Sequence, residues 1–186
     1  MRGVGDKICT ICGATPGQSC YNFVDDWDPE IHYIHFGDNM PKVHEIAKGM
    51  GYIKDGKPTP EQIMGIFGEE AFSQMRGGPS YWDMRGDVGP YEVRTTTLDK
   101  SLYVWDDEVT GQISKRKPFV LIYHCDRGTE VHNHAVGWIY GSEGRDRSWK
   151  TEVYNRGYCN FIDKSELHPM EELPRERDLS SDLWAD

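Results

Sequence analysis

Three cysteines near the start of the chain have the spacing of a metal site. Cys9 and Cys12 are separated by two residues, Cys20 follows, and His32 and His35 come twelve and fifteen residues after Cys20. Two thiolates on a tight turn suit tetrahedral Zn²⁺, and a third thiolate with an imidazole completes the usual set of four ligands. The spacing predicts a zinc ion held by Cys9, Cys12, Cys20 and either His32 or His35. Because four protein ligands leave no position open for a substrate, we expect the ion to be structural.

The composition favours metal binding over disulfide bonds. The chain has 186 residues and five cysteines, an odd number, and it begins without the apolar segment of a secretion signal. No apolar run reaches the roughly 18 residues of a membrane span. The net charge of -10 opposes a broad grip on nucleic-acid phosphates, so any DNA contact is expected to be local, at the basic clusters 115–117 or 145–150. We expect a protein of the reducing cytosol whose cysteines are ligands, the alternative being buried or free thiols.

A second group of chemically active residue types lies in the middle of the chain. Asp87 precedes Glu92 by five residues, and Arg94 follows Glu92 by two. In a strand, residues two apart face the same side, and the turn 88–90 can bring Asp87 to that side. Converging carboxylates are what Mg²⁺ requires, and a neighbouring arginine can stabilise charge on a phosphate. The pattern is typical of a Mg²⁺ site with Arg94 as its cation.

This segment and several short motifs resemble the PD-(D/E)XK restriction-endonuclease-like superfamily, and more closely a set of uncharacterised phage and prophage proteins. The matching motifs are GEEA (68–71), GDVGPYEVRTTT (86–97), WDD (105–107), PFVLIY (118–123), VGWIYG (136–141) and SELHPMEEL (165–173). The resemblance implies Mg²⁺-dependent hydrolysis of DNA, with Asp87 and Glu92 as metal ligands and with Glu69 or Glu70 as an acid on a helix. Helical periodicity places Glu70 nearer the apolar stripe, whereas the motif match favours Glu69.

The chain departs from that superfamily at two points. The third motif there usually carries lysine, which can titrate or orient water, whereas Arg94 stays protonated. The interval between Asp87 and Glu92 is also short, which leaves Asp83 as a substitute ligand. The alternative is a nuclease-like fold without catalysis, in a zinc-containing binding protein or a structural protein of a virion.

The cysteine segment in turn resembles zinc-finger modules of the pattern C-x2-C-G-A-x-P-G-x-x-C, found in many bacteriophage and actinobacterial proteins. In those modules a histidine opens an H-x-x-R step, and here His35 stands where the basic residue would be. The resemblance therefore favours His32 over His35. Together the two resemblances imply a protein of a bacterial host cytoplasm or of a virion, with DNA and proteins of a phage assembly as candidate partners.

Local patterns predict the elements that must position these residues. A short helix is expected to begin at Met40, and a second helix to run from Pro60 to Met75 behind Thr59 as its cap. Strands are expected over 91–97, 101–105, 119–124, 135–140 and 157–162, and a short helix over 164–173. We expect an α+β core over residues 39–173, a restriction-endonuclease-like mixed sheet with flanking helices. A zinc module over 1–38 precedes it, and a loosely held acidic tail over 174–186 follows.

A papain-like cysteine peptidase is another interpretation. Such enzymes place a nucleophilic cysteine after a glutamine and a histidine before an apolar strand, an order that Gln18, Cys20 and His134 imitate. A catalytic thiolate, however, usually lies at a helix N-terminus, and Cys20 precedes an acidic stretch instead. His132 and His134 are interpreted as loop or strand-edge residues rather than as ligands.

Overall fold

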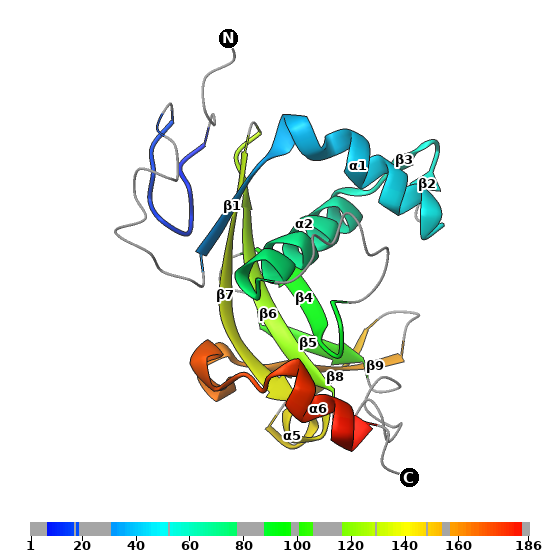
Figure 1. Cartoon of the computed structure of the whole chain (residues 1–186), viewed down its shortest axis with the longest axis vertical. Coiled ribbons are helices and arrows are strands. Elements are labelled where there is room, and N and C mark those ends of the chain that lie inside the picture. The colour runs from blue at the N-terminus through cyan, green and yellow to red at the C-terminus, as the bar shows by residue number, and fades with distance from the viewer. Residues whose placement is uncertain are drawn as a thin grey trace.

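A computed structural model describes residues 7–16, 18, 31–51, 53–77, 88–97, 101–105, 117–128, 130–147, 149–153 and 157–183 of the chain (Figure 1). The strands are β1 (Ile31–His35), β2 (Ile53–Lys54), β3 (Lys57–Pro58), β4 (Glu92–Thr96), β5 (Leu102–Trp105), β6 (Pro118–Asp126), β7 (Glu130–Tyr140), β8 (Trp149–Val153) and β9 (Gly157–Ile162). The helices are α1 (Phe36–Gly49), α2 (Pro60–Met75), α5 (Gly141–Arg147) and α6 (Glu176–Leu183), with 3-10 turns at Lys164–Glu166 and Met170–Glu172.

Two sheets organise these elements. The larger sheet has the order β1-β7-β6-β4, in which β4 runs parallel to β6 and the other neighbours are antiparallel. The smaller sheet has the order β5-β9-β8 and is antiparallel. Helix α2 crosses the larger sheet, whereas the smaller sheet lies toward one end of the molecule with α5 and α6 (Figure 1). The expectation of an α+β fold with a mixed sheet and helices is confirmed.

Strand β6 is buried on both of its faces. Val120 and Ile122 belong to the hydrophobic cluster that includes α2, whereas Phe119 and Leu121 belong to a second cluster with residues of β5 and β9. Since neighbouring residues of a strand face opposite sides, each face of β6 has its own core. This explains why its sequence is a continuous apolar run rather than an alternating one.

Helix α2 has the bounds that its sequence predicts. The Thr59 hydroxyl accepts a hydrogen bond from the Gln62 backbone N–H, and the Gln62 side chain accepts one from the Thr59 N–H, which is a capping box ahead of Pro60. Farther along, a Cβ on Gly68 would lie 1.9 Å from the Thr95 hydroxyl oxygen. Glycine at this position therefore allows α2 to approach β4 closely.

Strand β7 is longer than its sequence predicts. A strand was expected over 135–140, but β7 begins at Glu130 and pairs with β6 as far as Asp126 opposite Val131. The polar residues at its start are buried and have polar partners. The start of the strand therefore lacks the apolar pattern that marks an ordinary strand. His132 and His134 consequently lie within the strand, so their interpretation as loop or strand-edge residues is wrong.

Two segments that were expected to lie outside the core are attached to it. Strand β1, which the sequence analysis assigned to the zinc module, pairs along its whole length with β7. At the other end, α6 extends to Leu183 and Leu179 is 4% exposed. The Tyr91 hydroxyl donates a hydrogen bond of 2.6 Å to the Pro174 carbonyl, at the start of the segment that was expected to be loosely held. Both attachments form between residues that are far apart in the sequence. Strand β1 pairs with β7, and Leu179 of α6 packs in the hydrophobic core.

Candidate metal centre

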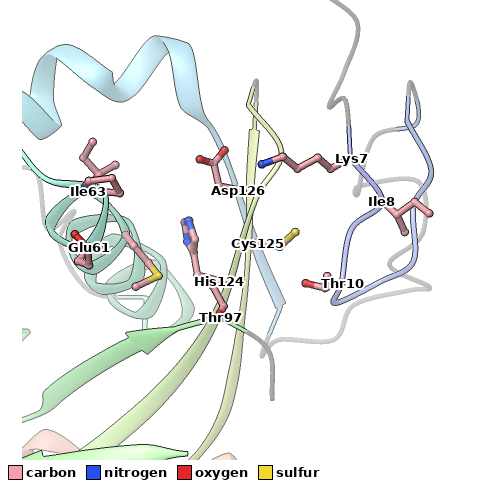
Figure 2. A pocket seen from close by; sticks show the side chains of 11 residues that line it. Lys7, Ile8, Thr10, Glu61, Ile63, Thr97, His124, Cys125 and Asp126 are labelled. Carbon is pink, nitrogen blue, oxygen red and sulfur yellow. The ribbon is translucent and has the colours of Figure 1, made fainter. Parts of the chain in front are cut away.

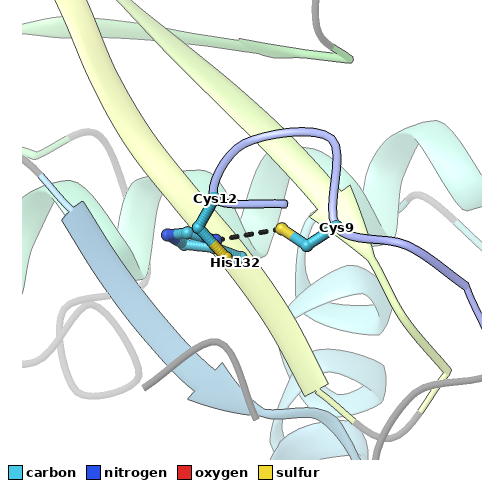
Figure 3. A group of neighbouring side chains, drawn as sticks. All are labelled: Cys9, Cys12 and His132. Carbon is cyan, nitrogen blue, oxygen red and sulfur yellow. Dashed lines mark hydrogen bonds between the residues drawn. The ribbon is translucent and has the colours of Figure 1, made fainter. Parts of the chain in front are cut away.

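Cys9, Cys12 and His132 form a group whose ligand atoms all lie within 4.8 Å of one another (Figure 3). Cys9 Sγ is 3.1 Å from His132 Nδ1. Cys9 is 1% exposed and His132 is 0% exposed, while Cys12 is half-buried. Two sulfur atoms and one imidazole nitrogen, largely removed from water, are a donor set typical of structural zinc.

The two thiols converge because the chain turns tightly between them. The Cys9 backbone N–H donates to the Ala14 carbonyl over 2.8 Å, and the Gly13 N–H donates to the Cys9 carbonyl over 2.9 Å. Gly13 has a φ of +77°, a left-handed conformation in which a side chain would be strained. The turn from Cys9 to Ala14, here called the knuckle, therefore forms from local sequence.

The residues on either side of the knuckle are bound to the hairpin of β6 and β7 by a buried arginine. Arg127 is 1% exposed, and its guanidinium donates to the backbone carbonyls of Lys7, Thr15 and Gln18 over 2.8–3.1 Å. It also donates to the Glu130 carboxylate over 3.1 Å. These contacts hold the knuckle beside β7, the strand that carries His132.

Burial favours the neutral form of the histidine. It lowers the pKa of His132 to about 4, with a smaller effect in the same direction from His134. A neutral imidazole offers the lone pair that a metal ion needs. The other ring nitrogen, Nε2, is buried and has no hydrogen-bond partner within the described part of the chain.

A third sulfur lies beside this group. Cys125, on β6, is 8% exposed and forms a cluster with Cys9 and Ala14. A hydrogen bond with the Cys9 thiol, together with burial, raises the pKa of the Cys125 thiol. The Cys125 side chain is therefore in contact with the knuckle.

A pocket of about 670 Å³ adjoins the knuckle (Figure 2). Its walls come from the start of the knuckle, the first turn of α2 and the ends of β4 and β6, with lining residues that include Lys7, Ile8, His124 and Cys125. His124 and Cys125 lie on opposite sides of β6, and Cys125 points toward the knuckle (Figure 2). His124 Nδ1 is 2.8 Å from Asn133 Oδ1, which fixes the ring against β7.

The predicted zinc ligands are only partly among the described residues. Cys9 and Cys12 come together as expected, whereas Cys20 lies outside the described residues. In β1, the backbone of His32 lies opposite Asn133 and that of His35 opposite Glu130, and their side chains are outside the description. The histidine that the structure places beside the thiols is His132, which the sequence analysis missed. The sequence signal that could have indicated this ligand was the pair of histidines at alternate positions, His132 and His134, just before an apolar strand.

The predicted acidic site is only partly among the described residues. Asp83 and Asp87 lie outside the described residues. Glu92 Oε1 is 2.5 Å from Arg94 Nη1, and Glu92 Oε2 is 2.6 Å from Lys117 Nζ. Each oxygen of this carboxylate thus has a cationic partner, one of them from the residue just before β6.

Glu69 and Glu70 lie on α2, on the other face of the larger sheet. Val93 belongs to the core cluster that includes α2, and Thr95 is the residue that Gly68 approaches. Since residues of a strand alternate between faces, Glu92 and Arg94 lie on the side away from α2. In agreement, the Arg94 guanidinium lies 5.8 Å from the ring centre of Phe119, in the cluster shared with β5 and β9. The geometry does not bring the helix acids together with Glu92.

Glu70 itself is 0% exposed and accepts a hydrogen bond from the Gln74 side chain one turn along α2. Buried carboxylates require such partners, because an isolated buried charge is costly. This contact supports a structural role for Glu70 on the buried side of α2.

Comparison of the chain with protein-family models, with curated proteins and with solved structures finds no match. Within the described residues, no helix is both long enough and apolar enough to cross a lipid bilayer.

Proposed function

We propose that Cys9, Cys12 and His132 hold a zinc ion with a structural role. The observation that carries this proposal is that two thiols and one imidazole lie within 4.8 Å of one another. The histidine is more than 100 positions away from the two cysteines in the sequence. Sulfur and imidazole donors suit Zn²⁺ far better than Mg²⁺ or Ca²⁺, which take oxygen ligands. When bound, the ion would tie the knuckle to β7, and its binding free energy would contribute to folding.

Elemental analysis of protein purified without chelators tests this proposal. We expect about one zinc ion per chain, and loss of zinc in the His132→Ala variant, because removing a ligand opens the site. His44→Ala, on α1, is the matched control and should keep its zinc. Absence of zinc from the wild type contradicts the proposal, and full zinc retention by His132→Ala would transfer the ligand role to His32 or His35.

Mg²⁺-dependent hydrolysis of DNA is a second candidate function, and the position of Lys117 favours it. The resemblance to the PD-(D/E)XK superfamily calls for a lysine near the metal-binding acid, a role that Arg94 cannot fill as a base. Lys117 immediately precedes β6, the strand that pairs with β4, and its Nζ lies 2.6 Å from Glu92 Oε2. We propose Glu92 as the metal ligand of this site, with Asp87 or Asp83 beside it, Lys117 as the titratable group and Arg94 as the phosphate-binding cation.

A Mg²⁺ ion at Glu92 must compete with the two cations that already bind its oxygens. A DNA phosphate that enters the site offers Arg94 and Lys117 a second anionic partner. The Glu92 oxygens then become available to the metal ion. The site would then assemble only with substrate and metal together. Partners in a phage assembly, and a place in the host cytoplasm or in a virion, are proposals that depend on the same resemblance.

A cleavage assay on linear, supercoiled and single-stranded DNA, with Mg²⁺ or Mn²⁺, tests the second candidate. Cleavage by the wild type should be lost in Glu92→Gln and in Lys117→Met, and retained in Lys57→Met, which removes an exposed lysine from β3. If the wild type cleaves none of these substrates, the protein is the non-catalytic zinc-containing binding or virion protein. Cleavage that survives Glu92→Gln would place the catalytic metal elsewhere.

A further inference from the structure

We propose that Cys125 is the fourth ligand of the zinc ion, so that the site is of the Cys3His type and consists of Cys9, Cys12, Cys125 and His132. This inference rests on the proposed zinc function and goes beyond it, because it assigns the remaining ligand. Structural zinc sites are almost always bound by four protein ligands. The three that converge in the structure leave one position to fill.

Contact with the knuckle is the first observation in favour of Cys125. Its side chain packs in one buried cluster with Cys9 and Ala14. Figure 2 shows its sulfur pointing from β6 toward the knuckle. Two sulfurs bound to one zinc ion lie about 3.8 Å apart, given Zn–S bonds of about 2.3 Å. The packing of Cys125 against Cys9 in one buried cluster is compatible with that separation.

The register of the hairpin is the second observation. Cys125 on β6 lies directly opposite His132 on β7. Directly opposite residues of an antiparallel pair face the same side of the sheet, with Cβ atoms about 4.5–5.5 Å apart. The hairpin therefore presents one thiol and one imidazole side by side toward the knuckle.

The site would then consist of two pairs of ligands. The knuckle supplies Cys9 and Cys12 at fixed spacing, and the hairpin supplies Cys125 and His132. Each pair is rigid before metal binds, since a tight turn fixes the first and backbone pairing fixes the second. The Cys125 sulfur is not among the ligand atoms that lie within 4.8 Å of one another, so closing the tetrahedron requires movement of this side chain toward the ion. Each cysteine that binds as a thiolate gives its proton to solvent.

Cobalt substitution tests the assignment. Co²⁺ in a tetrahedral thiolate site gives charge-transfer absorption in proportion to the number of bound thiolates. Cys125→Ser should lower this absorption by about a third, because two of three thiolates remain. Cys20→Ser should leave it unchanged, as should the control Cys159→Ser, which removes a buried cysteine hydrogen-bonded to the Val104 carbonyl. An unchanged spectrum in Cys125→Ser, or a loss in Cys20→Ser, would overturn the inference.

A measurement on the wild type covers the case in which Cys125→Ser does not fold. Loading with ¹¹³Cd²⁺ allows proton–cadmium correlation spectra, in which only the β-protons of bound cysteines and the ring protons of a bound histidine give signals. Signals from Cys9, Cys12, Cys125 and His132 are expected, whereas a signal from Cys20 in place of Cys125 would refute the assignment. Failure of the wild type to bind Co²⁺ or Cd²⁺ at all would instead refute the zinc function itself.

Discussion

Arg127 and Glu130 form an ion pair that is closed off from solvent. Arg127 Nη1 and Glu130 Oε1 are 3.1 Å apart, and the exposed fractions of the two side chains are 0% and 1%. Because the same guanidinium binds three backbone carbonyls of residues 7–18, this pair joins the knuckle to the hairpin independently of any metal ion. A metal ion would complete a site whose halves are already in place.

Arg127→Met is expected to lower the free energy of unfolding by about 3–5 kcal/mol, because it removes the cation that pairs with the buried Glu130 carboxylate. The double variant Arg127→Met/Glu130→Met should recover part of this loss, since no charge then remains buried. Urea unfolding followed by circular dichroism measures both. Arg177→Met is the control, since the exposed Arg177–Asp178 pair at 3.6 Å contributes little. Equal effects of Arg127→Met and Arg177→Met would show that the buried pair has no special role.

Gly68→Ala should destabilise the protein by about 1–3 kcal/mol or more, because the new methyl group would overlap the Thr95 side chain. Gly65→Ala, on the same helix, meets no atom within 4 Å and should stabilise by up to about 1 kcal/mol through helix propensity. Thermal unfolding of the two variants compares them directly. If both substitutions stabilise, α2 does not approach β4 as closely as described.

The attachment of α6 should depend on pH through Tyr91. Burial raises the pKa of Tyr91 above its ordinary value of 10.0, and its neutral hydroxyl donates to the Pro174 carbonyl. A pKa that is higher in the folded state means that this stabilisation is fully present below about pH 10 and is lost as pH rises through the folded pKa. The difference in unfolding free energy between wild type and Tyr91→Phe should therefore shrink above pH 10.

Hydrogen exchange of residues 176–183 gives a second measure, since Tyr91→Phe should speed exchange there at neutral pH. Tyr158→Phe, at a residue that is 52% exposed, is the control for both experiments. A pH profile of the Tyr91→Phe variant that matches the wild-type profile at every pH would be inconsistent with this role.

Removal of zinc should lower the melting temperature of the wild type, because an ion that binds only the folded state stabilises it. A strong chelator should have no such effect on His132→Ala, whose site is already open. Glu92→Gln, on the far strand of the larger sheet, should respond to the chelator as the wild type does. Differential scanning calorimetry with and without chelator makes the comparison, and an identical chelator response in His132→Ala would count against the metal centre.

Local sequence was sufficient to predict the parts of this protein that form through local contacts. Thr59 and Pro60 mark the start of α2 because the capping box lies within four residues. Cys9 and Cys12 indicate a metal site because one tight turn brings their thiols together. For the same reason a cysteine pair able to hold a metal ion could be predicted before the histidine that lies beside it.

Tertiary structure decided which distant residues complete each site. His132 lies 123 positions from Cys9 and reaches it only because β7 pairs with β6 and Arg127 holds the knuckle against that hairpin. Residues 68 and 95 likewise meet only when α2 packs on β4, and that packing puts Glu92 on the opposite face. Spacing along the chain cannot give these results, because strand pairing and helix packing depend on the free energy of burying surfaces that are far apart in sequence.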